Sequence, residues 1–132
     1  DICEKALKVA KKNNNQSKNK VNFIKSNWFS DVEGRFDLIT SNPPYIPEGT
    51  KLEASTLFEP KVALFSERTG LEDLKKIISE AINYLKINGA LILEHGIGQS
   101  SELSSYMKKI GYKNIGTLND LKDINRFVYG YK

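Results

Sequence analysis

The tetrapeptide Asn42-Pro43-Pro44-Tyr45 carries groups that can grip a planar amino group. The Asn42 side-chain oxygen is a hydrogen-bond acceptor. Pro43 holds the residue before it in an extended backbone, and its own carbonyl stays free to accept a second bond. Tyr45 adds a flat apolar face with a polar tip. Two acceptors and an aromatic wall can hold an NH₂ group and orient its lone pair, so these residues predict methylation of an amino group.

The place of the tetrapeptide supports this interpretation. It directly follows the apolar run 35–41, which we expect to be a strand. In open α/β sheets, ligands bind beyond the carboxyl ends of the strands. The alternative is that Pro43 and Pro44 only end a strand and begin a loop. We favour the site, because strand, asparagine, prolines and tyrosine follow one another in the order that an amino-group site requires.

Composition indicates one globular domain with a core. The chain has 132 residues, of which 39% are hydrophobic and 27% charged, and a net charge of +4. Apolar runs fall short of the roughly 20 residues of a membrane span, and Cys3 has no second cysteine to pair with. We therefore expect no membrane segment, no metal site and a reducing cytoplasm as the compartment. The early lysines could contact RNA or an acidic protein, but a solvated surface is the favoured interpretation.

The elements that must position the tetrapeptide follow from hydrophobic periodicity. We expect helices over 4–14, 71–88 and 103–110, and strands over 21–25, 35–41, 90–94, 112–118 and 126–131. Thr69 and Glu72 have the spacing of a capping box at the second helix, and Asn88-Gly89 is a typical stop. The largely apolar run 35–41 is expected to be buried on both faces. The segment 46–69 lacks a period and is interpreted as a lid or docking loop, or else as a poorly ordered insertion.

Alternation of helices and strands predicts an α/β fold with a mostly parallel sheet covered by helices on both sides. The last two strands are joined by a short polar turn around 120–125. So short a connection favours an antiparallel pair, which places one reversed strand at the end of the chain.

Several short segments carry a resemblance to a known family: Asn27-Trp28-Phe29, Asn42-Pro43-Pro44-Tyr45-Ile46, Phe58-Glu59-Pro60, Ala63-Leu64, Gly70-Leu71, Leu93-Glu94-His95-Gly96 and Arg126. Together they resemble the HemK-type methyltransferases, which modify a glutamine side-chain amide in peptide chain release factors. The match covers nearly the whole chain. The Phe-Glu-Pro and Leu-Glu-His-Gly segments point to the methyltransferases that modify glutamine. The Asn-Pro-Pro-Tyr motif recurs in many amino methyltransferases.

The resemblance implies a Rossmann-like fold with a reversed last strand and transfer of a methyl group from S-adenosylmethionine to a glutamine of a release factor. It implies that Asn42, Pro43 and Tyr45 are catalytic. It also implies that the substrate contacts these residues together with Pro44, Phe58 and Glu59.

The resemblance further implies a donor pocket. Asp1 is similar to the acidic residue that accepts the ribose hydroxyls, and Ile2 is expected to pack on the adenine. Asn27 takes the place of an aspartate that accepts the adenine amino group. The remaining contacts are expected from Trp28 and Phe29, as the wall of the pocket, and from Asn42.

The chain departs from the family pattern at its beginning. The family's glycine-rich turn after the first strand is expected upstream of Asp1, so 1–132 is expected to be the C-terminal portion of a single catalytic domain without its first strand. Donor binding by this chain alone is expected to be impaired. A non-catalytic fragment that associates through an exposed sheet edge is therefore an alternative.

A second alternative is an adenine-N6 or rRNA guanine-N2 methyltransferase, because the same tetrapeptide can grip an exocyclic amine. Such enzymes must extract a base and usually add a basic groove or recognition domain, and this sequence shows no such addition. His95 follows an apolar strand and is expected to support the residues of the site or simply to pack, rather than to act as an acid or base. For Glu94, a structural hydrogen bond and a role in the site are both open.

Overall fold

The computed structural model describes residues 1–14, 21–51 and 60–132, which form two compact units, 1–34 and 35–132. The first unit contains the helix α1, Glu4–Asn14, which confirms the predicted helix. The predicted strand over 21–25 is wrong, because these residues adopt no strand in the structure. A strand needs a neighbour along its length. Among the described residues, the backbone bonds of this segment join the Asp1 nitrogen to Ile24 O and Ser26 N to Asp1 O.

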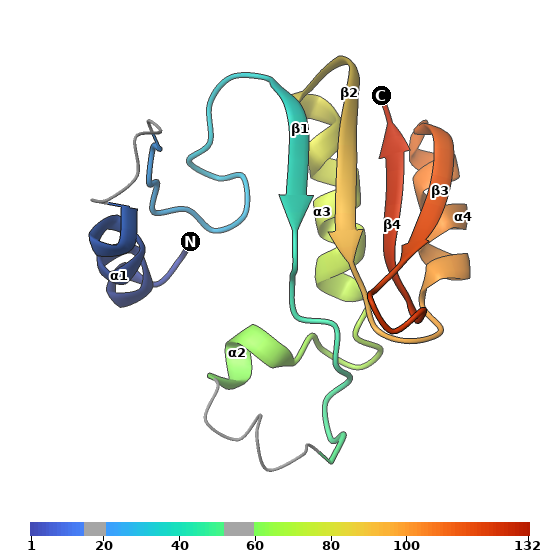
Figure 1. The fold of residues 1–132 in the computed structure, drawn as a ribbon, viewed down its shortest axis with the longest axis horizontal. Helices are drawn as coiled ribbons and strands as arrows, with labels where there is room; N and C mark the ends of the chain where they lie inside the picture. Colours follow the sequence, from blue (N-terminus) through green and yellow to red (C-terminus); the bar gives the residue numbers. More distant parts are fainter. Residues whose placement is uncertain (15–20, 52–59) are drawn as a thin grey trace. The chain divides into compact units, whose positions relative to one another are not determined.

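The second unit is built on a four-stranded sheet with the order β1-β2-β4-β3 (Figure 1). Its strands are β1 Phe36–Ser41, β2 Leu85–Glu94, β3 Lys113–Asn119 and β4 Asn125–Tyr131. β1 is parallel to β2, and β4 is antiparallel to both β2 and β3. Three strands therefore run in one direction and only the last strand is reversed. This confirms the predicted mostly parallel sheet with an antiparallel last strand.

Three helices accompany this sheet: α2 Lys61–Leu64, α3 Glu72–Tyr84 and α4 Ser100–Ile110. The two long ones, α3 and α4, pack side by side on one face of the sheet (Figure 1). The prediction of helices on both faces is wrong for residues 35–132. The chain crosses from β1 to β2 and then from β2 to β3 in the same direction along the sheet. Crossovers between parallel strands are right-handed, so both connecting helices lie on the same face.

The core of the second unit lies between this face and the two helices. Its fully buried apolar side chains come from every layer: Leu74, Ile77, Ile78 and Ala81 from α3, Leu103 and Met107 from α4, and Leu85, Leu91, Leu93 and Val128 from the strands. By contrast, Phe36 and Leu38 of β1 are 38% and 53% exposed. The prediction that this strand is buried on both faces is therefore wrong, because β1 is an edge strand of the described sheet and only β2 pairs with it.

The boundaries of α3 differ from those predicted. Glu72 reaches back to the Thr69 N–H at 3.3 Å, as a capping box requires, but the Thr69 hydroxyl accepts from the Leu71 N–H. The helix ends at Tyr84 rather than at Asn88-Gly89, and β2 begins at once. The difference follows from pairing, because Leu85 pairs with Phe36 of β1. Further along, the Lys132 backbone accepts from Asn88 N and donates to Gly89 O, so these residues also belong to the sheet.

The remaining elements agree with the sequence. α4 ends at Gly111, whose φ of 110° is the left-handed conformation that glycine favours at a helix end. β3 and β4 form the predicted antiparallel hairpin. In its turn, Asp120 Oδ1 accepts the backbone N–H groups of Lys122 and Ile124. Among the helices of the described ranges, none has the length and apolar character to cross a bilayer.

Leu91 is completely buried in β2, whereas Ile87 of the same strand is 85% exposed. We expect Leu91→Ala to lower the free energy of unfolding by about 2–5 kcal/mol, because it leaves a cavity between the sheet and the helices. Ile87→Ala is the matched control and should change it by less than about 0.5 kcal/mol. Urea unfolding followed by circular dichroism measures both. Equal losses in the two variants would contradict this description of the core.

Candidate active site

The tetrapeptide predicted to grip an amino group begins immediately after β1. Asn42 is exposed, Pro43 is buried, and Pro44 and Tyr45 are half-buried. Ser41 pairs with Leu93, so β1 and β2 end at the same edge of the sheet. Parallel pairing therefore brings Tyr45 beside Glu94, although the two residues are far apart in the sequence.

A charged pair fixes the Tyr45 hydroxyl. Tyr45 donates its O–H to Glu94 Oε1 at 3.1 Å and accepts a bond from Arg126 Nη2 at 2.6 Å. Arg126 also donates to the same oxygen of Glu94 at 3.1 Å. The carbon of its guanidinium group lies 5.1 Å from the centroid of the Tyr45 ring, within the range of a cation–π interaction.

These contacts define what Tyr45 can offer. Its hydroxyl both donates and accepts within the protein, so the hydroxyl anchors the ring. The ring itself is then the part of Tyr45 that can pack against a planar group. Glu94 and Arg126 have side chains that are 25% and 20% exposed, and the pair is therefore shielded from water more than most surface ion pairs.

The electrostatics of the three groups are coupled. Burial raises the pKa of the Tyr45 phenol, and the neighbouring Glu94 carboxylate raises it further, against the opposing effect of Arg126. Burial alone lowers the pKa of the Arg126 guanidinium, but its interactions with Tyr45 and Glu94 outweigh burial and the pKa is raised. At neutral pH the phenol is thus protonated and Arg126 is charged, which is the state that the hydrogen bonds require.

His95, next to this network, is completely buried. Its Nδ1 lies 2.8 Å from Gly96 O, and its backbone N–H donates to Arg126 O at 2.9 Å. Its Nε2 has no hydrogen-bond partner in the described part of the chain. The position fits the packing role expected from the sequence, and the backbone bond joins the end of β2 to the start of β4.

The segment after Tyr45 pairs with the segment that follows α2. Ile46 N donates to Leu64 O and Ile46 O accepts from Ser66 N, which forms an isolated parallel bridge with Phe65. Segment 46–69 therefore contains a short helix and a bridge, and its role as a lid stays a prediction. Phe58 and Glu59, predicted to contact the substrate, lie outside the described residues.

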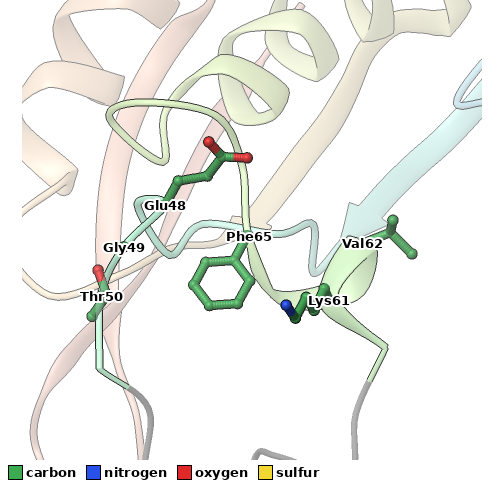
Figure 2. A pocket seen from close by; sticks show the side chains of 6 residues that line it. All are labelled: Glu48, Gly49, Thr50, Lys61, Val62 and Phe65. Carbon is green, nitrogen blue, oxygen red and sulfur yellow. The ribbon is translucent and has the colours of Figure 1, made fainter.

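Hollows lie among the described residues of the second unit, and a pair of them is considered for the site. One hollow has a volume of about 520 Å³ and is lined by Glu48, Gly49, Thr50, Lys61, Val62 and Phe65. Figure 2 shows the Phe65 ring between the 48–50 segment and α2. The other, of about 290 Å³, borders the network and is lined by Glu94, Ile97, Asp120, Lys122, Ile124, Arg126 and Phe127. Of these two hollows, the smaller adjoins Glu94 and Arg126, the groups that fix Tyr45. Among the described residues, no three His, Cys, Asp or Glu side chains group so as to hold a metal ion.

The residues predicted to hold the donor lie in the first unit, except for Asn42. The backbone bonds of Asp1 to residues 24 and 26 bring the start of the chain beside the segment that leads to Asn27. Asp1, Ile2 and Asn27 are exposed, and Trp28 and Phe29 are half-buried. Asp1 Oδ1 accepts the Cys3 N–H at 2.7 Å, which leaves the other carboxylate oxygen to accept from a ligand. This set of groups can bind hydroxyls, an amino group and a flat ring.

Sequence reasoning did not assign a role in the site to Arg126. It appeared only as a marker in the last strand. One signal could have revealed it: Arg126 is a charged residue at the start of an otherwise apolar antiparallel strand, and Glu94 is at the end of another. In an antiparallel pair, the start of one strand lies beside the end of the other, which predicts this ion pair.

The chain is similar in sequence to known methyltransferases. A family model described as "Methyltransferase small domain" matches residues 1–59. The release factor glutamine methyltransferase of Buchnera aphidicola subsp. Baizongia pistaciae is 38% identical over 100% of this chain and 49% of its own length. That of Pasteurella multocida is 40% identical over 98% of the chain and 45% of its own length. The chain thus spans about half the length of the curated relatives that it matches.

A solved structure shows the fold. A methyltransferase from Pyrococcus furiosus aligns with 100% of this chain and 60% of its own, with a TM-score of 0.72 and 22% sequence identity. The chain therefore has a Rossmann-like methyltransferase fold of the α/β class, as the sequence predicted.

The Tyr45 phenol provides a test of the network. We expect it to ionise above the ordinary tyrosine value of about 10, and we expect Glu94→Gln to lower its pKa, because a negative charge 3.1 Å away no longer opposes the phenolate. The ultraviolet absorbance of phenolate measures this, after subtraction of the curve of Tyr45→Phe to remove the other tyrosines. Glu102→Gln removes an exposed carboxylate elsewhere and should leave the difference curve unchanged. An unchanged curve in Glu94→Gln would contradict the coupling.

Proposed function

This chain is related over its whole length to release factor glutamine methyltransferases, and on that premise we propose that it forms part of an enzyme that methylates the side-chain amide of a glutamine in a peptide chain release factor. The observation that carries the proposal is the placement of the tetrapeptide. In a methyltransferase fold, Asn42 is exposed directly after β1, and three residues later Glu94 and Arg126 fix the Tyr45 hydroxyl.

We further propose that both units belong to one catalytic domain, of which residues 1–132 are the C-terminal portion. The similarity to the Buchnera relative extends over both units, and the chain corresponds to 49% of that relative's length.

The proposed compartment is the cytoplasm. The single cysteine, which has no disulfide partner within these 132 residues, fits a reducing compartment.

The proposed methyl donor is S-adenosylmethionine. The exposed groups of the first unit fit it chemically: the carboxylate of Asp1 for ribose hydroxyls, the amide of Asn27 for the adenine amino group, and Ile2 for the adenine face. Trp28 and Phe29 complete the proposed pocket, and Asn42 is proposed to contact the donor as well as the substrate. When bound, S-adenosylmethionine supplies an electrophilic methyl group on a sulfonium sulfur.

The proposed task of the tetrapeptide is to orient a poor nucleophile. The lone pair of an amide nitrogen is delocalised into its carbonyl. Asn42 Oδ1 and the Pro43 carbonyl each accept one N–H of the substrate amide, which directs the nitrogen toward the methyl group. The Tyr45 ring packs against the amide plane. With the substrate nitrogen held by Asn42 and Pro43, the donor would supply the methyl group, and the methylated nitrogen would then release one proton to solvent.

The arrangement of Asn42 and Pro43 suits this task. Pro43 is buried, so its backbone is held in place, and its ring restricts Asn42 to an extended backbone. An exposed acceptor on a fixed backbone is preorganised, because little conformational freedom is lost when the substrate amide binds.

We expect Asn42→Ala in the full-length enzyme to lower the rate of methyl transfer to a release factor by about 10²-fold, because one of the two acceptors that orient the nitrogen is lost. Transfer of a radiolabelled methyl group to the release factor measures the rate. Asn22→Ala, at an exposed position of the first unit, is the matched control and should retain the rate. A normal rate in Asn42→Ala would contradict the proposed grip.

The substrate class is tested by competition among three acceptors. We expect the full-length enzyme to transfer the labelled methyl group to a release factor, and mass spectrometry of its peptides to locate the group on a glutamine side chain. Ribosomal RNA and DNA, offered under the same conditions, should remain unlabelled. Label in either nucleic acid, with none in the release factor, would overturn the proposal in favour of methylation of a base amino group.

A further inference from the structure

We propose that Gln99 is a positioning residue that holds the backbone of Tyr45 for methyl transfer, an inference that rests on the function proposed above. Gln99 immediately precedes α4. Its Nε2 donates to Tyr45 O at 3.2 Å and to Gly70 O at 3.3 Å. Its Oε1 accepts the Gly96 N–H at 2.8 Å. One carboxamide therefore contacts three separate backbone segments.

Each of these segments leaves or enters a different element of the fold. Tyr45 follows β1, Gly70 precedes α3, and Gly96 follows β2. A planar amide carries two N–H donors and an acceptor on one rigid group, which is the combination needed to bind two carbonyls and one N–H. Asparagine has the same group on a shorter stem, so glutamine is the side chain with both the chemistry and the reach.

Close packing of two glycines against Tyr45 supports this role. Gly70 has a φ of +74°, and a Cβ on it would lie 2.3 Å from Tyr45 O. A Cβ on Gly96 would lie 3.0 Å from Gln99 Oε1 and 3.3 Å from Cδ2 of Tyr45. Both glycines thus leave space for the Tyr45 backbone or ring, and Gln99 joins them to it.

Tyr45 is consequently held at both ends. Glu94 and Arg126 fix its hydroxyl, and Gln99 fixes its carbonyl. The Tyr45 carbonyl is also two residues along the backbone from Pro43, whose own carbonyl is proposed to grip the substrate. A shift of this backbone would misplace the grip and the ring together. A misplaced backbone spoils the orientation of the substrate amide, and this lowers the rate of the chemical step more than it lowers substrate binding.

The test is the pH dependence of Gln99→Glu. An ionised glutamate has no donor and repels the two carbonyls, whereas a protonated glutamate can donate to one of them and still accept the Gly96 N–H. In the full-length enzyme we expect kcat to fall about 10²-fold relative to the unmodified protein near neutral pH, with little change in KM for the donor. The deficit should shrink as pH falls toward the glutamate pKa, about 4.3 when unperturbed.

Two controls separate positioning from general damage. Ser101→Glu adds the same charge at an exposed position two residues along α4 and should retain activity at every pH. Gln99→Ala should show a deficit that does not depend on pH. If Gln99→Glu instead loses the same factor at all pH values, or if KM rises in place of a fall in kcat, the positioning role is wrong.

A second readout does not depend on activity. In the 132-residue chain with ring-labelled tyrosine, the resonance of Tyr45, assigned with Tyr45→Phe, should move in Gln99→Glu at neutral pH and return toward its original position on acidification. Ser101→Glu should not move it. An unmoved resonance would overturn the role of Gln99. The resonance could move while the full-length enzyme without substitutions methylates no release factor. That outcome would support the role of Gln99 and overturn only the proposed function.

Discussion

The pairing of β1 with β2 and of β2 with β4 is the constraint on which the site depends. Parallel β1 and β2 end at one edge of the sheet, and antiparallel β4 begins there. The register places Phe127 opposite Glu94, and Arg126 O accepts the His95 N–H. Glu94 and Arg126 are therefore adjacent because of backbone hydrogen bonds, and Tyr45 reaches both. Arg126 directly precedes the residue opposite Glu94, so the register of β4 sets the distance between the two side chains.

The partly buried charges at this edge contribute more to geometry than to stability. Removing a carboxylate and a guanidinium from water has a desolvation cost that offsets much of their attraction. Glu94 and Arg126 nevertheless both bond to the Tyr45 hydroxyl, and these two bonds fix the orientation of the tyrosine side chain. The raised pKa of the phenol has the same origin, because burial and Glu94 both oppose a negative charge on it. The network thus keeps Tyr45 neutral and fixed, which suits a residue whose proposed role is to pack against an amide.

The backbone around the tetrapeptide is fixed by a different set of interactions. Pro43 is buried, Gly70 contacts the Tyr45 carbonyl closely, and Gln99 bonds to that carbonyl. Asn42 remains exposed beside them. A rigid backbone with one exposed acceptor is the arrangement expected where a protein must orient a weak nucleophile, since the protein then contributes alignment and needs no strong base.

The sequence by itself determined three of the described helices, the core of each strand in the sheet and the chemistry of the tetrapeptide. Period-3.6 patterns located α1, α3 and α4, and the short polar turn before β4 predicted the reversed last strand. These features are local, so neighbouring residues are enough to specify them. The exposure of β1, the extension of β2 back to Leu85 and the helices on one face were decided only by tertiary structure, because each depends on which strand lies beside which. The network of Tyr45, Glu94 and Arg126 and the contacts of Gln99 have the same origin. They join segments that are distant along the chain, and only the pairing of the strands brings those segments together.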